Sequence, residues 1–122
     1  MKVKRIQIKS VEQGLKEFAR AFNSVVARKS IKPQHGTFFA SIAAARRFLT
    51  PSRIALLKTI KQHKPASLYE LAKLTHRDFK NISEDIAFLS DLGLVDLGRP
   101  HGPRSQRKPT LLSDHIYLEI AI

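Results

Sequence analysis

The sequence predicts a mainly helical α+β fold with a small β-hairpin, and three features of its 122 residues lead to this prediction. Apolar residues recur at helical spacing in segments that begin with helix-capping residues. Apolar and polar residues alternate near both ends of the chain, which is typical of strands. Two short apolar segments flank a stretch rich in glycine and proline, which favours a hairpin with a long loop.

The N-terminal segment predicts a strand followed by a helix. Residues 2–9 alternate, with Ile6 and Ile8 on one side, as in a short strand. Ser10 stands three residues before Gln13, which is the spacing of a capping box. The apolar face predicted for the following helix consists of Val11, Leu15, Phe18, Phe22 and Val25 or Val26.

The next segment is predicted to be a connector that leads into a short helix. Residues 27–36 are basic and contain Pro33, which favours a loop. A brief strand is expected at residues 37–39. Ser41 is a candidate cap for a helix that ends at Phe48.

The segment from Thr50 to about His63 is predicted to be a helix. Thr50 is a capping residue, and Pro51 stands at the first helical position, where a missing N–H costs nothing. The residues predicted to face inward are Ile54, Leu57 and Ile60.

Two further helices are predicted, with a short turn between them. Ser67 and Glu70 form a capping box for a helix that ends at about Thr75. A turn follows, in which Asp78 is a candidate cap for a helix that ends near residue 92. The inward residues of that helix are predicted to be Ile82, Ile86 and Leu89.

The C-terminal part predicts strands and one long loop. Gly93 stands where a left-handed helix end belongs, and residues 94–97 predict a strand. Residues 98–109 contain two glycines and three prolines and must form a loop. Residues 110–112 predict the returning strand, and alternation over 116–122 predicts a half-buried final strand.

This order of elements predicts a winged helix-turn-helix. In that fold a bracing helix holds a recognition helix in the major groove, and a hairpin wing reaches the adjacent backbone or minor groove. The brace is expected at residues 67–75, the recognition helix at 80–92 and the wing tip at 99–108. Residues 49–113 are therefore predicted to be the DNA-binding domain. Residues 1–48 are predicted to be a dimerisation or partner-binding extension, and the predicted C-terminal strand completes the chain over 114–122.

Charge points to a polyanionic partner. Lysine and arginine number 22 against 10 acidic residues, so the formal net charge is +12. Such self-repulsion is costly unless a polyanion offsets it, which makes nucleic acid the first candidate and an anionic membrane surface the second. Two acid-free, basic stretches, residues 18–69 and 97–113, lie on either side of the predicted recognition helix.

Candidate contacts to double-stranded DNA come from the predicted recognition helix and wing. Arginine pairs with guanine and asparagine with adenine, whereas lysine and arginine also hold phosphates, and the sequence leaves these roles open. The predicted DNA-binding residues are Ser67, Arg77, Lys80, Asn81, Ser83, Glu84, Arg99, Arg104, Arg107 and Lys108.

Residues 50–97 resemble the winged-helix region of MarR-like prokaryotic transcriptional regulators. More narrowly, the segment is similar to a family of small predicted regulators, some proposed as antitoxin components. The resemblance rests on LTPSRIALL at 49–57, SLYELA at 67–72, RDFKNI at 77–82 and LGLV at 92–95. It implies a sequence-specific regulator of transcription that binds duplex DNA.

Enzyme chemistry finds little support in the sequence. There is no cysteine, the five histidines lack metal-ligand spacing, and no phosphate-binding glycine loop or nucleophile elbow is present. We therefore expect no catalytic residue, no metal and no cofactor. No apolar run is long enough to span a membrane and no signal peptide is evident, so a cytoplasmic location is expected.

Three partner hypotheses follow. A homodimer is expected, with residues 2–9, the helix after them and residues 116–122 at its interface. The first alternative to a transcriptional regulator is an antitoxin, which would bind a toxin protein and repress their shared operon. An RNA-binding module is the second, because the basic stretch over residues 18–69 would suit RNA.

Overall fold

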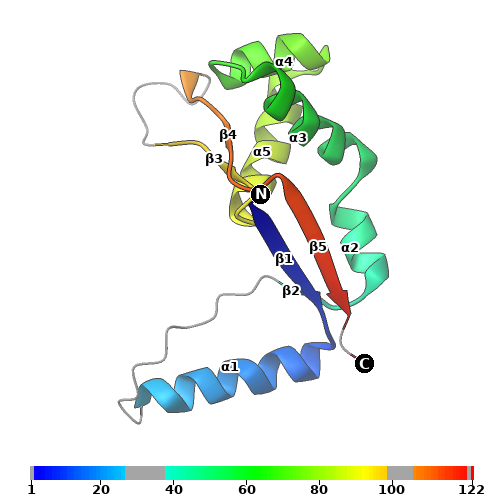
Figure 1. Cartoon of the computed structure of the whole chain (residues 1–122), viewed down its shortest axis with the longest axis vertical. Coiled ribbons are helices and arrows are strands. Elements are labelled where there is room, and N and C mark those ends of the chain that lie inside the picture. The colour runs from blue at the N-terminus through cyan, green and yellow to red at the C-terminus, as the bar shows by residue number, and fades with distance from the viewer. Residues whose placement is uncertain (1, 27–37, 99–105, 121) are drawn as a thin grey trace. The chain divides into compact units, whose positions relative to one another are not determined.

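The computed structural model describes residues 2–26, 38–98, 106–120 and 122 (Figure 1). These residues form five helices and five short strands in two small sheets, in agreement with the mixed helix and strand content predicted. The chain divides into two compact units. We call residues 1–4 and 49–116 the helical unit and residues 5–48 and 117–122 the terminal unit.

The helical unit contains three helices and a hairpin. The helices are α3 (Pro51–His63), α4 (Leu68–Thr75) and α5 (Phe79–Asp91), and α4 packs against both of the others (Figure 1). The hairpin pairs β3 (Val95–Asp96) with β4 (Thr110–Leu111) in antiparallel fashion. It packs on α5 through β3 and on α3 through β4.

Local capping sets the start of α3 as predicted. The Thr50 hydroxyl accepts a hydrogen bond from the Arg53 N–H at 3.2 Å, and proline occupies the first position of the helix. The helix ends at Lys64, which adopts a left-handed conformation with φ 45°. The buried face consists of Leu56, Leu57 and Ile60, whereas Ile54, predicted to be inward, is only half-buried.

The start of α4 confirms half of its predicted capping box. The Ser67 hydroxyl accepts from the Glu70 N–H at 3.0 Å. The Glu70 carboxylate, however, accepts from the N–H of Ala66, the residue before the cap, at 3.0 Å. The Leu68 N–H donates to the carbonyl of Arg107 at 3.1 Å, so the start of α4 is tied to the segment that leads into β4.

The predicted cap at the start of α5 is wrong, whereas the left-handed glycine predicted just beyond its end is confirmed. Asp78 precedes the helix, but its exposed side chain makes no capping hydrogen bond, and only its carbonyl accepts from the Ile82 N–H. Gly93 has φ 76°, the left-handed conformation expected just beyond the helix. The face of α5 that packs inward is fully buried and consists of Ile82, Ile86 and Leu89, as predicted.

The terminal unit is built on a small sheet. Its strand order is β2-β1-β5, where β1 is Val3–Ile8, β2 is Phe38–Phe39 and β5 is His115–Ile120, and the division between the units falls within β1 and β5. Strand β2 runs parallel to β1, with Gln7 opposite Phe38. Ile6 and Ile8 are buried, as the alternation predicts.

Two helices complete this unit. Helix α1 (Val11–Val26) starts at Ser10, whose hydroxyl accepts from the Gln13 N–H, and α2 (Ile42–Phe48) starts at Ser41, whose hydroxyl accepts from Ala44. Both caps were predicted. The predicted loop at 27–36 lies outside the described residues.

The apolar face of the first two turns of α1 is exposed. Val11, Leu15 and Phe18 have 55%, 63% and 69% of their surface accessible. A face of this kind gains stability only when another surface covers it, because removing apolar area from water is the main favourable contribution to association. No described helix is both long and apolar enough to cross a bilayer.

Candidate nucleic-acid interface

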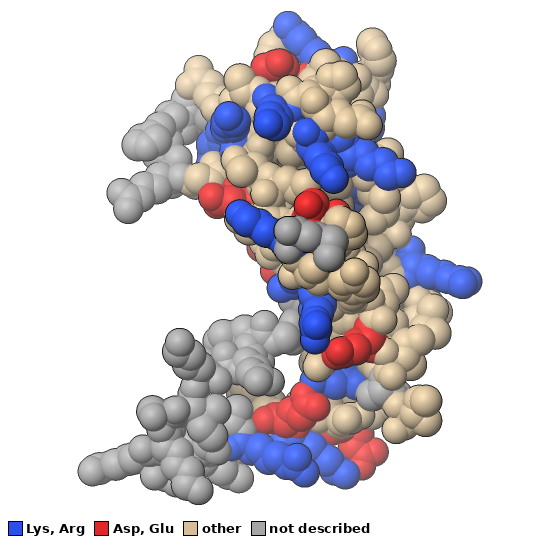
Figure 2. Space-filling view, in the orientation of Figure 1, with Lys and Arg blue, Asp and Glu red and all other residues tan. Residues whose placement is uncertain are grey.

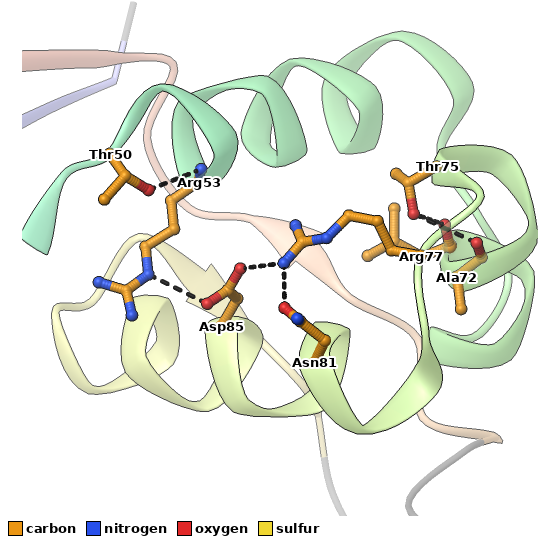
Figure 3. Close-up of polar contacts among 8 residues, drawn as sticks. Thr50, Arg53, Ala72, Thr75, Arg77, Asn81 and Asp85 are labelled. Carbon is orange, nitrogen blue, oxygen red and sulfur yellow. Dashed lines mark hydrogen bonds and ion pairs between the residues drawn. The ribbon is translucent and has the colours of Figure 1, made fainter.

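The candidate site begins at the turn between α4 and α5. Helix α4 ends where His76 adopts a left-handed conformation, with φ 54°. The Thr75 hydroxyl donates to the Ala72 carbonyl at 3.2 Å (Figure 3) and to the Leu71 carbonyl at 2.9 Å. The Arg77 backbone N–H donates to the same Ala72 carbonyl at 3.1 Å. Three residues therefore suffice to redirect the chain from one helix into the next.

The first half of α5 has a polar outer face. Lys80, Asn81 and Glu84 are exposed, and Ser83 is half-buried at the edge of this face. The opposite face of the helix is fully buried, so α5 is fixed in rotation about its axis. The structure thus brings four of the predicted contact residues together on one helix and presents three of them to solvent.

Arg77 is placed differently from the other predicted contacts. Its side chain is 24% exposed and lies against Asp85, a buried residue one turn beyond Asn81 on α5. Arg77 Nη2 donates to Asp85 Oδ2 at 2.6 Å and also to Asn81 Oδ1 (Figure 3).

A second arginine completes the cluster from α3. Arg53 Nε donates to Asp85 Oδ1 at 3.1 Å, so each carboxylate oxygen accepts from a different guanidinium. The Arg53 guanidinium also lies over the Phe88 ring, 4.2 Å from its centroid, in a cation–π contact. Two cations face one anion, and the cluster therefore keeps positive charge beside the outer face of α5.

Sequence reasoning missed Arg53 and Asp85. One signal was available: Asn81 and Asp85 are spaced four residues apart, which places their side chains along one row of a helix, and Arg77 stands four residues before Asn81. The partner from α3 could not be found in this way, because Arg53 precedes Asp85 by 32 residues.

The base of the hairpin holds another predicted contact residue. Arg107 donates from Nε to the Leu97 carbonyl at 3.3 Å and from Nη2 to the Gly98 carbonyl at 2.6 Å. Its guanidinium is thus engaged with backbone next to β3, whereas Lys108 is exposed. The predicted contacts Arg99 and Arg104 lie outside the described residues.

Ser67 has a structural task in addition to its predicted contact, because its hydroxyl caps α4.

Basic side chains lie near the site. Figure 2 shows Lys and Arg side chains spread over this part of the molecule, with acidic ones among them. Lys73 on α4 is exposed and lies over the Tyr69 ring, 4.5 Å from its centroid.

One titratable pair lies at the start of β5. His115 Nδ1 is 2.9 Å from Asp114 Oδ1, and this hydrogen bond lowers the pKa of the exposed Asp114 carboxyl below its ordinary value. Across residues 2–26, 38–98, 106–120 and 122, no group of histidine and acidic side chains could hold a metal ion.

Fold and site together define a small α+β protein in which a tight turn joins two packed helices and exposes the polar face of the second. Residues 48–118 match the family model described as HVO_A0114, and this match spans more than half of the chain. The protein belongs to the HVO_A0114 family. No curated protein matches it.

Proposed function

We propose that this protein is a sequence-specific regulator of transcription that binds double-stranded DNA as a winged helix-turn-helix. One observation carries the proposal. The turn at residues 76–78 and the buried face of α5 leave Lys80 and Asn81 on an exposed helix face. The major groove of B-DNA admits one α-helix, and side chains on such a face reach base edges there.

In this proposal α4 is the bracing helix and α5 the recognition helix. Lys80 suits a phosphate or a guanine, Asn81 an adenine, and Glu84 the amino group of cytosine. Lys73 on α4 is exposed and suits a phosphate contact, which would fix the register without reading sequence.

The hairpin β3–β4 is proposed to be the wing. Arg107, near the end of the loop, bonds to the backbone at the start of the loop beside β3, and the exposed Lys108 is available to the DNA backbone. Arg99 and Arg104 stay predicted contacts. The resemblance to MarR-like regulators supports this assignment by analogy.

We further propose that the working form is a homodimer. The exposed apolar face of α1 and the exposed side chains of β5, among them Tyr117 and Ile120, offer a surface that a second copy could cover. A two-fold dimer would present two recognition helices to the two halves of a palindromic site.

The same exposed face favours one second candidate function, that of an antitoxin. A toxin protein would then cover α1 while the helical unit binds the promoter of their operon. Co-purification of the protein with the product of an adjacent gene, lost on substitution of Leu15, would support the antitoxin. A dimer of the protein alone, with no such co-purification, would contradict it.

Binding to labelled nucleic acids tests the main proposal. The full-length protein should prefer duplex DNA over structured RNA, and its affinity should fall steeply between about 50 and 200 mM salt, because each phosphate neutralised contributes about −0.9 to the log–log slope. An affinity that is independent of salt, or a preference for RNA, would overturn it. The role proposed is binding, in the cytoplasm, and includes no catalytic step.

A further inference from the structure

A chain of hydrogen bonds links a buried carboxylate to an exposed amide on the proposed recognition helix. Arg77 Nη2 donates to Asp85 Oδ2 at 2.6 Å and to Asn81 Oδ1, which engages both of its N–H groups. Asp85 is held on its other oxygen by Arg53 at 3.1 Å. Asp85 and Asn81 of α5 thus hold the Arg77 guanidinium in place, and Arg53 of α3 holds Asp85 (Figure 3).

The guanidinium decides which way the Asn81 amide faces. An arginine side chain offers only donors, so the amide oxygen and not the amino group must face Arg77. The amino group of Asn81 is then directed away from Arg77, on a residue that is exposed. Because an amide oxygen has two lone pairs, Oδ1 keeps one for a further donor.

This arrangement matches one base in the major groove. Adenine presents the N7 acceptor beside the N6 amino donor, and a carboxamide bonds to both at once. Guanine presents two acceptors there, cytosine offers its amino donor, and thymine offers an acceptor and a methyl group. A carboxamide with a fixed orientation discriminates among these patterns, whereas one that rotates can adapt to several of them.

We propose that Asp85 and Arg77 are positioning residues that orient Asn81 for the recognition of adenine. The inference rests on the DNA binding proposed above and deepens it. Arg77 acts here through Asn81 and not mainly as a contact to phosphate, because its side chain is 24% exposed and its Nη2 is already engaged. Asp85, which sequence reasoning passed over, becomes a determinant of specificity without touching DNA.

Selection from a duplex library with a randomised centre tests this, with full-length protein at about 150 mM salt. The wild-type protein should enrich adenine at a fixed position. Arg77→Lys keeps the charge but loses the planar two-donor bridge, and it should lower that preference about tenfold while overall affinity changes less. Lys73→Met, at the proposed phosphate contact on α4, is the matched control, which should weaken binding to all sequences and keep the preference.

A double-mutant cycle separates positioning from direct contact. If Arg77 acts through Asn81, adding Arg77→Lys to Asn81→Ala should cause no further loss of base preference. Additive losses would show an independent contact or a general structural role and would overturn the inference. Circular dichroism spectra and unfolding curves of each variant establish that the helices are intact.

The two proposals fail in different ways. A folded wild-type protein that binds no duplex DNA overturns the proposed function and this inference with it. A wild-type protein that selects a DNA sequence, while Arg77→Lys and Asn81→Ala keep its adenine preference, overturns the inference alone.

Discussion

Arg77, in the turn between α4 and α5, donates a hydrogen bond to the buried carboxylate of Asp85 at 2.6 Å. The contact joins the turn to the middle of α5, one turn beyond Asn81. Arg53 brings α3 to the same carboxylate at 3.1 Å. One acidic side chain therefore couples the geometry of three consecutive helices of the helical unit, and its removal should be felt in stability as well as in recognition.

Asp85→Asn should lower the free energy of unfolding by about 1–3 kcal/mol. The substitution keeps the size of the side chain but removes the charge that two partly buried guanidinium groups face. This loss of stability is smaller than that expected for a fully buried ion pair, because both arginines keep some contact with water. Urea unfolding followed by circular dichroism measures the change.

Glu84→Gln is the matched control for this prediction. Glu84 is the neighbouring acidic residue on α5 and is exposed, so the same change of charge there should shift stability by less than about 0.5 kcal/mol. Equal losses in the two variants would show that the carboxylate of Asp85 has no special task.

Lys108→Met should weaken duplex binding uniformly across sequences and reduce the log–log salt slope by about 1. Lys108 is exposed at the base of the hairpin that we propose as the wing, and a lysine there would neutralise a phosphate. Fluorescence anisotropy over a series of salt concentrations provides both quantities. Lys58→Met, at an exposed lysine of α3 outside the proposed contacts, should leave the slope unchanged. If both variants lower the slope alike, the wing has no distinct role.

The sequence predicted the element boundaries well where local hydrogen bonds decide them. Caps at Ser10, Ser41, Thr50 and Ser67 involve residues three positions apart, and all four are present. Asp78 shows the limit of such rules, because its residue type suits a cap and its side chain nevertheless points to solvent without a capping bond.

The candidate site was harder to predict because its central contacts are not local. The outward positions of Lys80 and Asn81 follow from helical periodicity and the apolar face of α5. Buried Asp85 is paired with Arg53, far earlier in the chain, and no periodic pattern encodes that pairing. The exposure of the α1 apolar face is likewise a property of the folded chain, since the pattern alone does not say what covers it.

A pH effect is expected at Asp114. The hydrogen bond from His115 lowers the pKa of this carboxyl in the folded protein. A lowered pKa in the folded state contributes stability above the unfolded value of about 4, and this contribution is lost as the pH falls through the lowered value. His115→Ala should raise the pKa of Asp114 towards its ordinary value in an NMR titration of carboxyl carbons. An unaltered Asp114 titration would show that His115 is not the cause.

Phe18→Glu should dissociate the proposed dimer without destabilising the monomer. Phe18 is 69% exposed on α1, so a charge there costs the isolated chain little, whereas at a covered interface it would be buried without a partner. Sedimentation velocity over a range of micromolar concentrations should show a dimer for the wild-type protein and a monomer for Phe18→Glu. Gln13→Glu, at an exposed position on the opposite face of α1, should leave the dimer intact. A wild-type protein that sediments as a monomer would contradict the proposed dimer, and a different partner would then cover α1. The wild-type chain should then bind DNA through single half-sites, without enrichment of inverted repeats.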